Sequence, residues 1–131
     1  MIRVLVADDQ AMVRAGLRLI LESQPEVDVV GEAADGEEAQ ASARRHRPDV
    51  VLMDIRMPRL DGISATRQLI EHDPTSRVLV VTTFEAAQNV FQGLRAGASG
   101  LIPEDSKPEQ LVAAVRRSAP GDPRRRPAHT P

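Results

Sequence analysis

The chain has 131 residues, of which 41% are hydrophobic and 27% are charged, and its formal net charge is −2. These values are typical of one globular domain, and so small a charge gives no electrostatic argument for binding nucleic acid or membranes. Without cysteine the chain has no disulfide or thiolate metal site, and no apolar run approaches the roughly 20 residues of a membrane span. The N-terminal residues enter a strand-like run without a signal-peptide pattern, so we expect a cytoplasmic location.

Short apolar runs alternate with helical patterns along the whole chain. Strands are predicted at residues 2–7, 27–30 (extending toward 33), 49–53, 77–83 and 99–102. Apolar stripes at helical spacing predict helices around residues 13–21, 63–70, 87–94 and 111–115, and residues 36–46 carry only the small stripe of Ala39 and Ala43. Five such βα units predict an α/β fold, a doubly wound, flavodoxin-like parallel sheet of five strands in the order 2-1-3-4-5.

Residues at the ends of the predicted helices agree with this assignment. Asp35 with Glu38 resembles a helix N-cap with its reciprocal acid, and Ser106 with Glu109 has the spacing of a capping box. Gly97 lies where a helix should end. We therefore expect one domain over residues 1–118, followed by a disordered, proline- and arginine-rich linker or tail over residues 119–131.

Three carboxylates are predicted to meet at the carboxyl edge of the sheet. Asp8 and Asp9 follow the first strand, Asp54 ends the third, and these two strands are neighbours in the predicted order. Oxygen ligands of this kind suit a hard divalent cation such as Mg²⁺. The alternative is that each aspartate only caps a helix or a turn, although three at two strand ends favour the cation site. Thr82 ends the fourth strand at the same edge, where its hydroxyl group could donate to an anion held at Asp54, or could simply belong to a strand.

Four segments together resemble the receiver domain of two-component response regulators. They read VLVADDQ at 4–10, DVVLMDIRMPRLDG at 49–62, VLVVTTFE at 78–85 and RAGASG at 95–100. Within this family, the sequence pattern most resembles that of the NarL/FixJ group, whose output domain is a LuxR-type helix-turn-helix. The resemblance covers about residues 2–117.

The resemblance implies a role for each matching residue. Asp54 would accept a phosphoryl group from the phosphohistidine of a sensor histidine kinase. Asp9 would bind Mg²⁺ directly, Asp8 would assist partly through water, and the backbone carbonyl of Arg56 would complete the metal site. Thr82 would hydrogen-bond the phosphoryl oxygen and move with it, repacking a surface formed by the fourth helix, the fifth strand and the fifth helix.

The chain departs from the family pattern at two positions. The family places a lysine four residues after the second glycine of the GASG element, and this position is Glu104 here. Lys107 lies three residues further on, and we interpret it as a surface helix residue in preference to a substitute cation. The position of the family's aromatic switch residue is Leu101. Both departures bring ordinary phosphorylation-driven switching into question.

Three functions are therefore compared. The first is a receiver controlled by phosphorylation that regulates a transcriptional output domain, if the chain is a fragment. The second is an atypical receiver that acts as a phosphorylation-independent interaction or dimerisation module, because of Glu104. The third is a small Mg²⁺-dependent phosphatase. The sequence offers no general acid to support it, so we expect that the chain is not an enzyme. A homodimer is plausible, and we expect no direct binding of this domain to nucleic acid or membranes.

Overall fold

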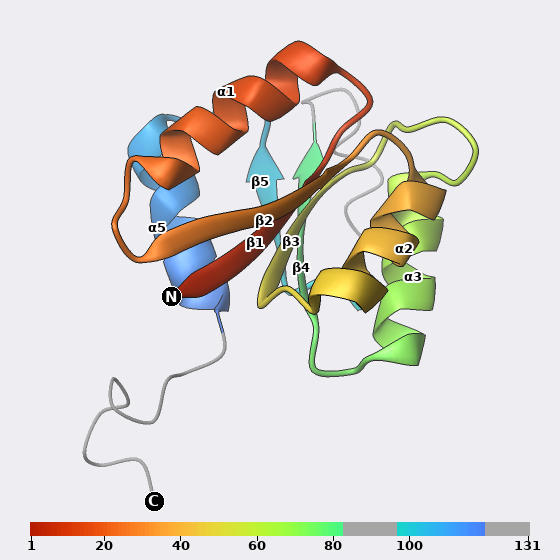
Figure 1. The fold of residues 1–131 in the computed structure, drawn as a ribbon. Coiled ribbons are helices and arrows are strands. Elements are labelled where there is room, and N and C mark those ends of the chain that lie inside the picture. The colour runs from red at the N-terminus through yellow and green to blue at the C-terminus, as the bar shows by residue number, and fades with distance from the viewer. Residues whose placement is uncertain (83–96, 120–131) are drawn as a thin grey trace, which may run out of the picture.

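The computed structural model describes residues 1–82 and 97–119 and contains a parallel sheet of five strands in the order β2-β1-β3-β4-β5 (Figure 1). This arrangement confirms the predicted fold class and strand order. The elements are β1 (Ile2–Ala7), α1 (Ala11–Glu22), β2 (Val27–Ala33), α2 (Gly36–His46), β3 (Val50–Asp54), α3 (Gly62–His72), β4 (Arg77–Thr82), β5 (Gly100–Pro103) and α5 (Pro108–Ser118). The helix predicted around residues 87–94 and most of the predicted tail lie outside the described residues.

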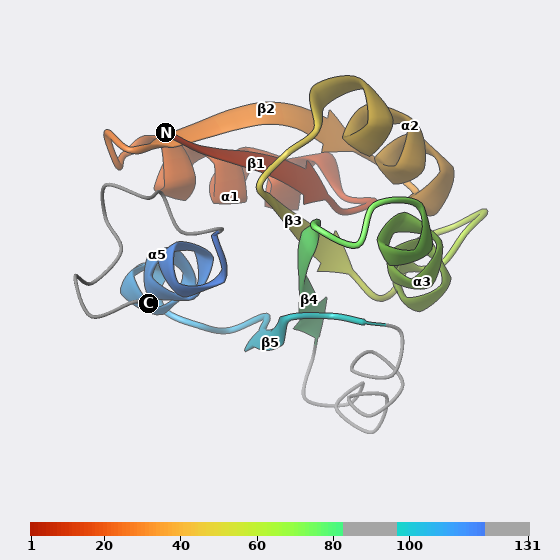
Figure 2. The ribbon, with the colours of Figure 1, turned by 90° about the horizontal axis from the view of Figure 1, so that it is seen from below.

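Helices cover both faces of the sheet (Figures 1 and 2). Alternate residues of each central strand point to opposite faces, so Val4 and Val6 of β1 pack toward α1 and α5, and Leu5 packs toward α2 and α3. All three side chains are fully buried. Because both faces are apolar, the central strands read as continuous apolar runs, which is why the sequence predicts them well.

The first turn of α2 has the cap that the sequence predicts. The Asp35 carboxylate accepts a hydrogen bond from the backbone N–H of Glu38 (2.8 Å). The Glu38 carboxylate reaches back to the backbone N–H of Ala34 (3.0 Å), one residue before the position of an ordinary capping box.

The predicted capping box at the start of the last helix is wrong. The N-cap of α5 is Lys107 instead of Ser106, and the side chain of Gln110 accepts a hydrogen bond from the backbone N–H of Lys107 (3.0 Å). Pro108 explains the shift, because a proline suits the first helical position and forces the residue before it into an extended conformation. Lys107 is exposed and is the residue at which α5 begins, so Ser106 does not form a capping box with Glu109.

β3 and β5 are shifted by one residue from their predicted bounds, and Thr83, predicted to end the fourth strand, lies outside the described residues. β3 begins at Val50, although the preceding Asp49 still bonds to β1: its N–H donates to the carbonyl of Arg3 (2.8 Å), and its carboxylate accepts from the Arg3 N–H (2.8 Å). β5 runs from Gly100 to Pro103, one residue later than expected at each end. Such shifts are normal at strand ends, where a side chain competes with the regular ladder.

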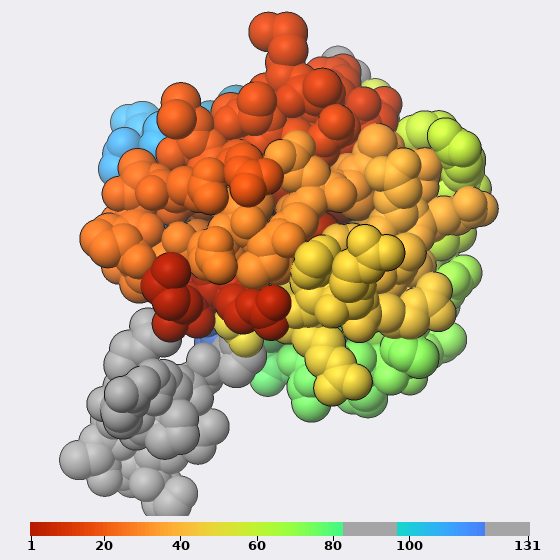
Figure 3. All heavy atoms as spheres, in the orientation of Figure 1, coloured from red at the N-terminus to blue at the C-terminus, as the bar shows by residue number. Residues whose placement is uncertain are grey.

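The outer side of α1 carries exposed apolar residues. Met12 is 88% exposed and Leu19 is 76% exposed. In Figure 3 this helix, red-orange in the colour bar, runs along the upper edge of the molecule, with its outer side uncovered in that view. Among the described residues, no helix is long and apolar enough to cross a membrane.

Candidate functional site

Three carboxylates meet at the carboxyl edge of the sheet, as the sequence predicts. β1 and β3 are neighbours, with Ala7 paired to Met53, so the residues that follow each lie side by side. Asp8, Asp9 and Asp54 each offer one carboxylate oxygen, and these oxygens lie within 4.8 Å of one another. We call these three residues the acidic site. It is the set of oxygen ligands that a hard divalent cation prefers, so the residues present fit such an ion.

Asp8 is the most rigidly held member of the acidic site. Its side chain is buried, and one carboxylate oxygen accepts a hydrogen bond from the backbone N–H of Gln10 (2.8 Å). Its backbone N–H donates to the carbonyl of Ala33 on β2 (2.9 Å), and its own carbonyl accepts from the guanidinium of Arg14 (2.7 Å). The alternative that Asp8 only caps the first helix is wrong: the N-cap of α1 is Gln10, with no side-chain cap, and the hydrogen bond from Gln10 to Asp8 closes a turn before that helix.

Burial works against the charge on Asp8. Desolvation raises the pKa of its carboxyl group, and the negative charges of Asp9 and Glu104 raise it further, whereas the hydrogen bond from Gln10 acts in the opposite direction. The site therefore holds negative charge at a cost in free energy that a bound cation would offset.

Asp54 is partly buried at the end of β3. Burial and the neighbouring charge of Asp8 raise the pKa of its carboxyl group to about 7, and Asp9 and Glu104 contribute in the same direction. One oxygen accepts a hydrogen bond from the backbone N–H of Arg56 (3.2 Å), so Asp54 also caps a turn. A proton and a cation therefore compete for this carboxylate near neutral pH.

Gly62, the first residue of α3, brings that helix against the backbone of Asp54. A Cβ atom at Gly62 would lie 1.9 Å from the carbonyl oxygen of Asp54, so no side chain fits there. The backbone N–H of Gly62 donates to the carbonyl of Ile55 (2.9 Å), and Asp61 caps the helix by accepting from the N–H of Ser64 (2.9 Å). This contact holds the loop after β3 in place. The sequence analysis did not predict it, although an Asp-Gly pair directly before a helical pattern could have indicated it.

Thr82 and Glu104 lie at the same edge of the sheet: Thr82 ends β4, the neighbour of β3, and Glu104 directly follows β5, the neighbour of β4. Thr82 ends β4 and is buried, and Asp54 is paired in register with the residue before it, Val81. The backbone N–H of Glu104 donates to the carbonyl of Thr82 (2.8 Å). The structure therefore places Thr82 and Glu104 beside the acidic site, as expected from the strand order.

Glu104 acts on the acidic site through its charge. Its exposed carboxylate raises the pKa of both Asp8 and Asp54, which shows that its negative charge reaches the site. Among residues 1–82 and 97–119, the compact group of carboxylates contains Asp8, Asp9 and Asp54 without it. Glu104 thus adds repulsion without belonging to that group of ligands.

The ion pairs outside the acidic site were not predicted, and one of them involves a buried carboxylate. The guanidinium of Arg59, in the loop after β3, lies 3.0 Å from the buried carboxylate of Asp35 at the start of α2. Arg59 has a left-handed backbone, with φ of 66°. No pattern in the sequence signals this contact, since it joins two loops that only the fold brings together.

Comparison with known proteins agrees with the geometry. A family model described as the response regulator receiver domain matches residues 4–116. The chain is 43% identical over 121 residues to the uncharacterized transcriptional regulatory protein YxjL of Bacillus subtilis, covering 92% of this chain and 56% of YxjL. It is 40% identical over 124 residues to the transcriptional regulatory protein LiaR of the same organism, covering 95% of this chain and 59% of LiaR.

A solved structure gives the same result. The receiver domain of the putative response regulator NarL from Mycobacterium tuberculosis aligns with a TM-score of 0.84 and 36% identity, covering 88% of this chain and 94% of that one. The chain spans between half and three fifths of the length of the two curated relatives it matches.

Proposed function

The chain belongs to the response regulator receiver domain family, in the NarL/LuxR-type group that includes LiaR, NreC and YxjL, and we propose that it accepts a phosphoryl group on Asp54. It is a signalling domain of transcriptional regulators and not an enzyme with an external substrate. Family membership implies a histidine kinase as the partner that supplies the phosphoryl group. The observation that carries the proposal is the position of Asp54, partly accessible and within a compact group of three carboxylates.

The proposed step is a transfer between two side chains. A carboxylate oxygen of Asp54 attacks the phosphorus of the kinase phosphohistidine, the P–N bond breaks as the P–O bond forms, and the electron pair returns to the imidazole nitrogen. The ionised form of Asp54 is a much stronger nucleophile than the protonated form, and its pKa of about 7 leaves part of the population protonated at neutral pH. Groups that neutralise charge around the site therefore favour the step.

We assign the cation of this site as Mg²⁺, held by Asp8, Asp9, Asp54 and the backbone carbonyl of Arg56. When bound, Mg²⁺ supplies positive charge that offsets the carboxylates and the oxygens of the transferred group. Asp9 is exposed and free to meet an ion that arrives from solvent, whereas Asp8 is held in one orientation by Gln10. The oxygen-only ligand set supports magnesium over softer metals.

Thr82 is the proposed sensor of the phosphoryl group. It lies at the end of the strand next to Asp54, and its hydroxyl group would donate a hydrogen bond to a phosphoryl oxygen. Thr82 is paired with Pro103 of β5, so a movement of Thr82 would pass to β5 and α5; the fourth helix of the expected surface lies outside the described residues. A bistable element that follows added charge is the physical basis of such a switch.

Glu104 supports a second candidate function. Its charge already raises the pKa of Asp8 and Asp54, and it would repel a phosphoryl group bound at Asp54. An atypical receiver that works by dimerisation or partner binding, without phosphorylation, is therefore the alternative.

The remaining assignments concern the whole protein. LiaR and YxjL are named transcriptional regulatory proteins and are longer than this chain, so we propose a LuxR-type DNA-binding output domain as a partner. We further propose that the receiver ends at residue 118 and is followed by a linker over residues 119–131. We also propose that it works in the cytoplasm and can form a homodimer. Ala119, the first residue of this proposed linker, still packs against the core beside α5.

Beryllofluoride, a mimic of the phosphoryl group, tests the main proposal. With millimolar Mg²⁺ it should raise the thermal unfolding temperature of the wild-type chain and shift the NMR signals of residues near Asp54. The matched Asp54→Asn variant keeps the size of the side chain but lacks the reacting oxygen, so it should show neither response. An equal response of both proteins, or none in either, would refute the assignment of Asp54.

A further inference from the structure

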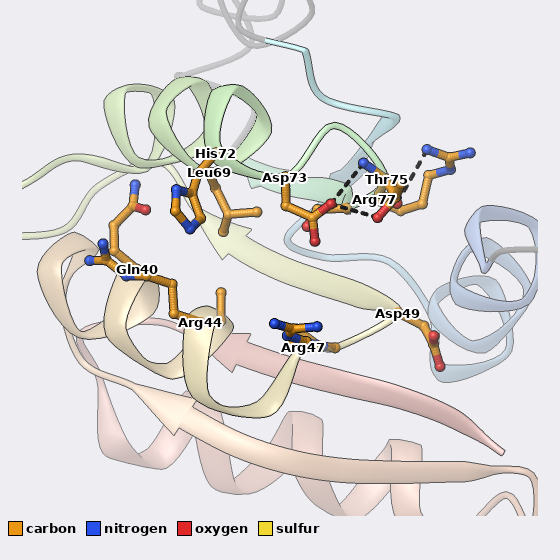
Figure 4. Close-up of a pocket in the computed structure, with 12 residues that line it drawn as sticks. Gln40, Arg44, Arg47, Asp49, Leu69, His72, Asp73, Thr75 and Arg77 are labelled. Atoms are coloured by element: carbon orange, nitrogen blue, oxygen red, sulfur yellow. Dashed lines mark hydrogen bonds between the residues drawn. The ribbon is translucent and has the colours of Figure 1, made fainter.

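A second concave site lies at the opposite edge of the sheet from the acidic site. It is a half-open groove of about 880 Å³ between the C-terminal ends of α2 and α3, at the amino ends of β3 and β4 (Figure 4). This volume is in the range of about 300–1,000 Å³ that small-molecule sites occupy. The proposed phosphorylation chemistry makes no use of it.

The groove combines an apolar base with cationic walls. Ala43, Pro48 and Leu69 contribute apolar surface, and Pro48 and Leu69 are buried. Figure 4 shows the side chains of Leu69 and His72 projecting from α3 toward α2, where Arg44 and Arg47 line the facing side. In Figure 4 the guanidinium group of Arg44 lies on the Gln40 side of the groove and that of Arg47 on the Asp49 side, so a ligand would meet apolar atoms below it and one guanidinium group toward each end.

The carboxylates that line the groove are already engaged. Asp49 accepts a hydrogen bond from the backbone N–H of Arg3 (2.8 Å). One oxygen of Asp73 accepts from both the N–H (3.1 Å) and the hydroxyl group (2.6 Å) of Thr75. These bonds from Thr75 hold the pKa of Asp73 below its usual value, and the charge of Arg47 acts in the same direction.

The arginines, by contrast, keep their hydrogen-bonding capacity. Within the described part of the chain, neither Arg44 nor Arg47 lies within ion-pair distance of a carboxylate. Arg77 also lines the groove, but Figure 4 shows its side chain directed away from the two helices. Two guanidinium groups are thus available to an anion that enters from solvent.

The backbone of Arg47 ends α2. It forms the C-cap of α2 in the left-handed region, with φ of 45°. Glycine is favoured at such a position, and any other residue there costs of the order of 1 kcal/mol in backbone strain. The helix end does not need this cation, since Arg44, Arg45 and His46 already occupy its last turn. The guanidinium group of Arg47 is thus not required to end α2 and stays available to a ligand.

We propose that this groove binds a phosphate-bearing small molecule of nucleotide size that contains a planar ring. The guanidinium groups of Arg44 and Arg47 pair with the phosphate oxygens, for which their planar donor geometry is suited. The ring packs against the floor of the groove, which Ala43 forms together with the buried side chains of Pro48 and Leu69, beside the imidazole of His72. The site is separate from Asp54, so its occupancy does not depend on phosphorylation.

ADP is the probe that tests this proposal, because it carries both a phosphate group and a planar ring. It is titrated into the ¹⁵N-labelled 131-residue chain with EDTA present, so that the acidic site takes no part through a metal. Amide signals of residues 43–49 and 69–77 should shift with a dissociation constant on the order of 1 mM or tighter. Signals of Asp8, Asp9 and Asp54 should stay in place.

Two comparisons make the test specific. Adenosine and pyrophosphate should each bind at least about tenfold more weakly than ADP, because each lacks one of the two contacts. The double variant Arg44→Gln/Arg47→Gln should weaken ADP binding by at least about tenfold, whereas the control Arg45→Gln, on the same helix but outside this groove, should leave it unchanged. No shifts at the groove with several millimolar ADP, shifts that survive the double variant, or pyrophosphate binding as tightly as ADP would overturn the proposal.

Discussion

The backbone N–H of Glu104 donates to the carbonyl oxygen of Thr82 over 2.8 Å, which joins the exposed acid to the end of the strand beside Asp54. The bond fixes the backbone of Glu104 at the carboxyl edge of the sheet, where related receivers are expected to carry a lysine. Its charge raises the pKa of both Asp8 and Asp54. Glu104 is therefore the residue that most directly separates the two candidate functions.

Replacing Glu104 by lysine should strengthen the binding of beryllofluoride in the presence of Mg²⁺. The change turns a repulsive charge into an attractive one, so we expect affinity to rise at least about tenfold, and Glu104→Gln to give a smaller gain. Isothermal titration calorimetry measures the beryllofluoride affinity of each variant. Glu71→Lys, the same charge change on the exposed end of α3 at the other edge of the sheet, is the matched control and should have no effect. Equal affinities in the wild type and both Glu104 variants would remove the reason for the atypical function.

The affinity for Mg²⁺ should increase with pH across neutrality. In the metal-free protein the pKa of Asp54 is about 7, so a proton leaves this carboxylate as the pH rises and the cation takes its place. Between about pH 6 and about pH 8 we expect Mg²⁺ to bind roughly tenfold more tightly, as measured by NMR titration. Asp54→Asn should bind more weakly and lose most of this dependence. A wild-type affinity that stays constant over this range would contradict the raised pKa.

Removing the charge of Asp54 should stabilise the metal-free fold at alkaline pH. The folded-state pKa of Asp54 is raised from 3.8 to about 7, so the folded state binds the proton more tightly than the unfolded state. The stabilisation of the fold by the proton on Asp54 is fully present below about pH 4 and is lost as the pH rises through about 7. With EDTA at about pH 8, Asp54→Asn should be more stable by about 1–2 kcal/mol after allowance for solvent screening.

Urea unfolding over a range of pH measures this difference. The two proteins should converge at acid pH, where Asp54 is neutral. Asp28→Asn, on the exposed side of β2, serves as the control and should follow the wild type throughout. A variant that is less stable than the wild type at pH 8 would mean that Asp54 makes favourable contacts that outweigh its burial.

Much of this architecture follows from local sequence. The central strands are predicted because both of their faces are buried, as in the run from Val50 to Met53, and the capping of α2 by Asp35 is visible in the spacing to Glu38. The gathering of Asp8 and Asp54 follows once the strand order is assumed, because neighbouring parallel strands end at one edge.

Other features depend on distant segments and leave no local pattern. The approach of Gly62 to Asp54, the ion pair between Arg59 and Asp35, and the groove beside Arg47 each arise only when separate elements pack together. The start of α5 was misplaced because the Ser106 pattern was weighed above Pro108, whose fixed backbone sets the first helical position.

Adding a single methyl group at Gly62 should disturb the acidic site. Its Cβ atom would lie 1.9 Å from the Asp54 carbonyl oxygen and 2.9 Å from Cα of Ile55, so the backbone beside the site must move. We expect Gly62→Ala to destabilise the fold by about 2–4 kcal/mol and to weaken Mg²⁺ binding.

Gly16→Ala provides the matched control for Gly62→Ala. A Cβ atom there meets no atom within 4 Å, so this substitution inside α1 should stabilise the fold by about 0.5–1 kcal/mol and leave Mg²⁺ binding unchanged. Chemical unfolding and calorimetry report the two effects. A fully stable Gly62→Ala variant with normal affinity would show that the loop after β3 tolerates displacement.

Phosphorylation of the chain itself tests the central claim most directly. Phosphoramidate, whose P–N bond resembles that of a phosphohistidine, is incubated with the wild type, Asp54→Asn and Glu104→Lys in the presence of Mg²⁺, and the products are measured by intact-protein and peptide mass spectrometry. We predict one added phosphoryl group on Asp54, slower in the wild type than in Glu104→Lys and absent from Asp54→Asn. A phosphoryl group on another residue, or none on either the wild type or Glu104→Lys, would contradict the account.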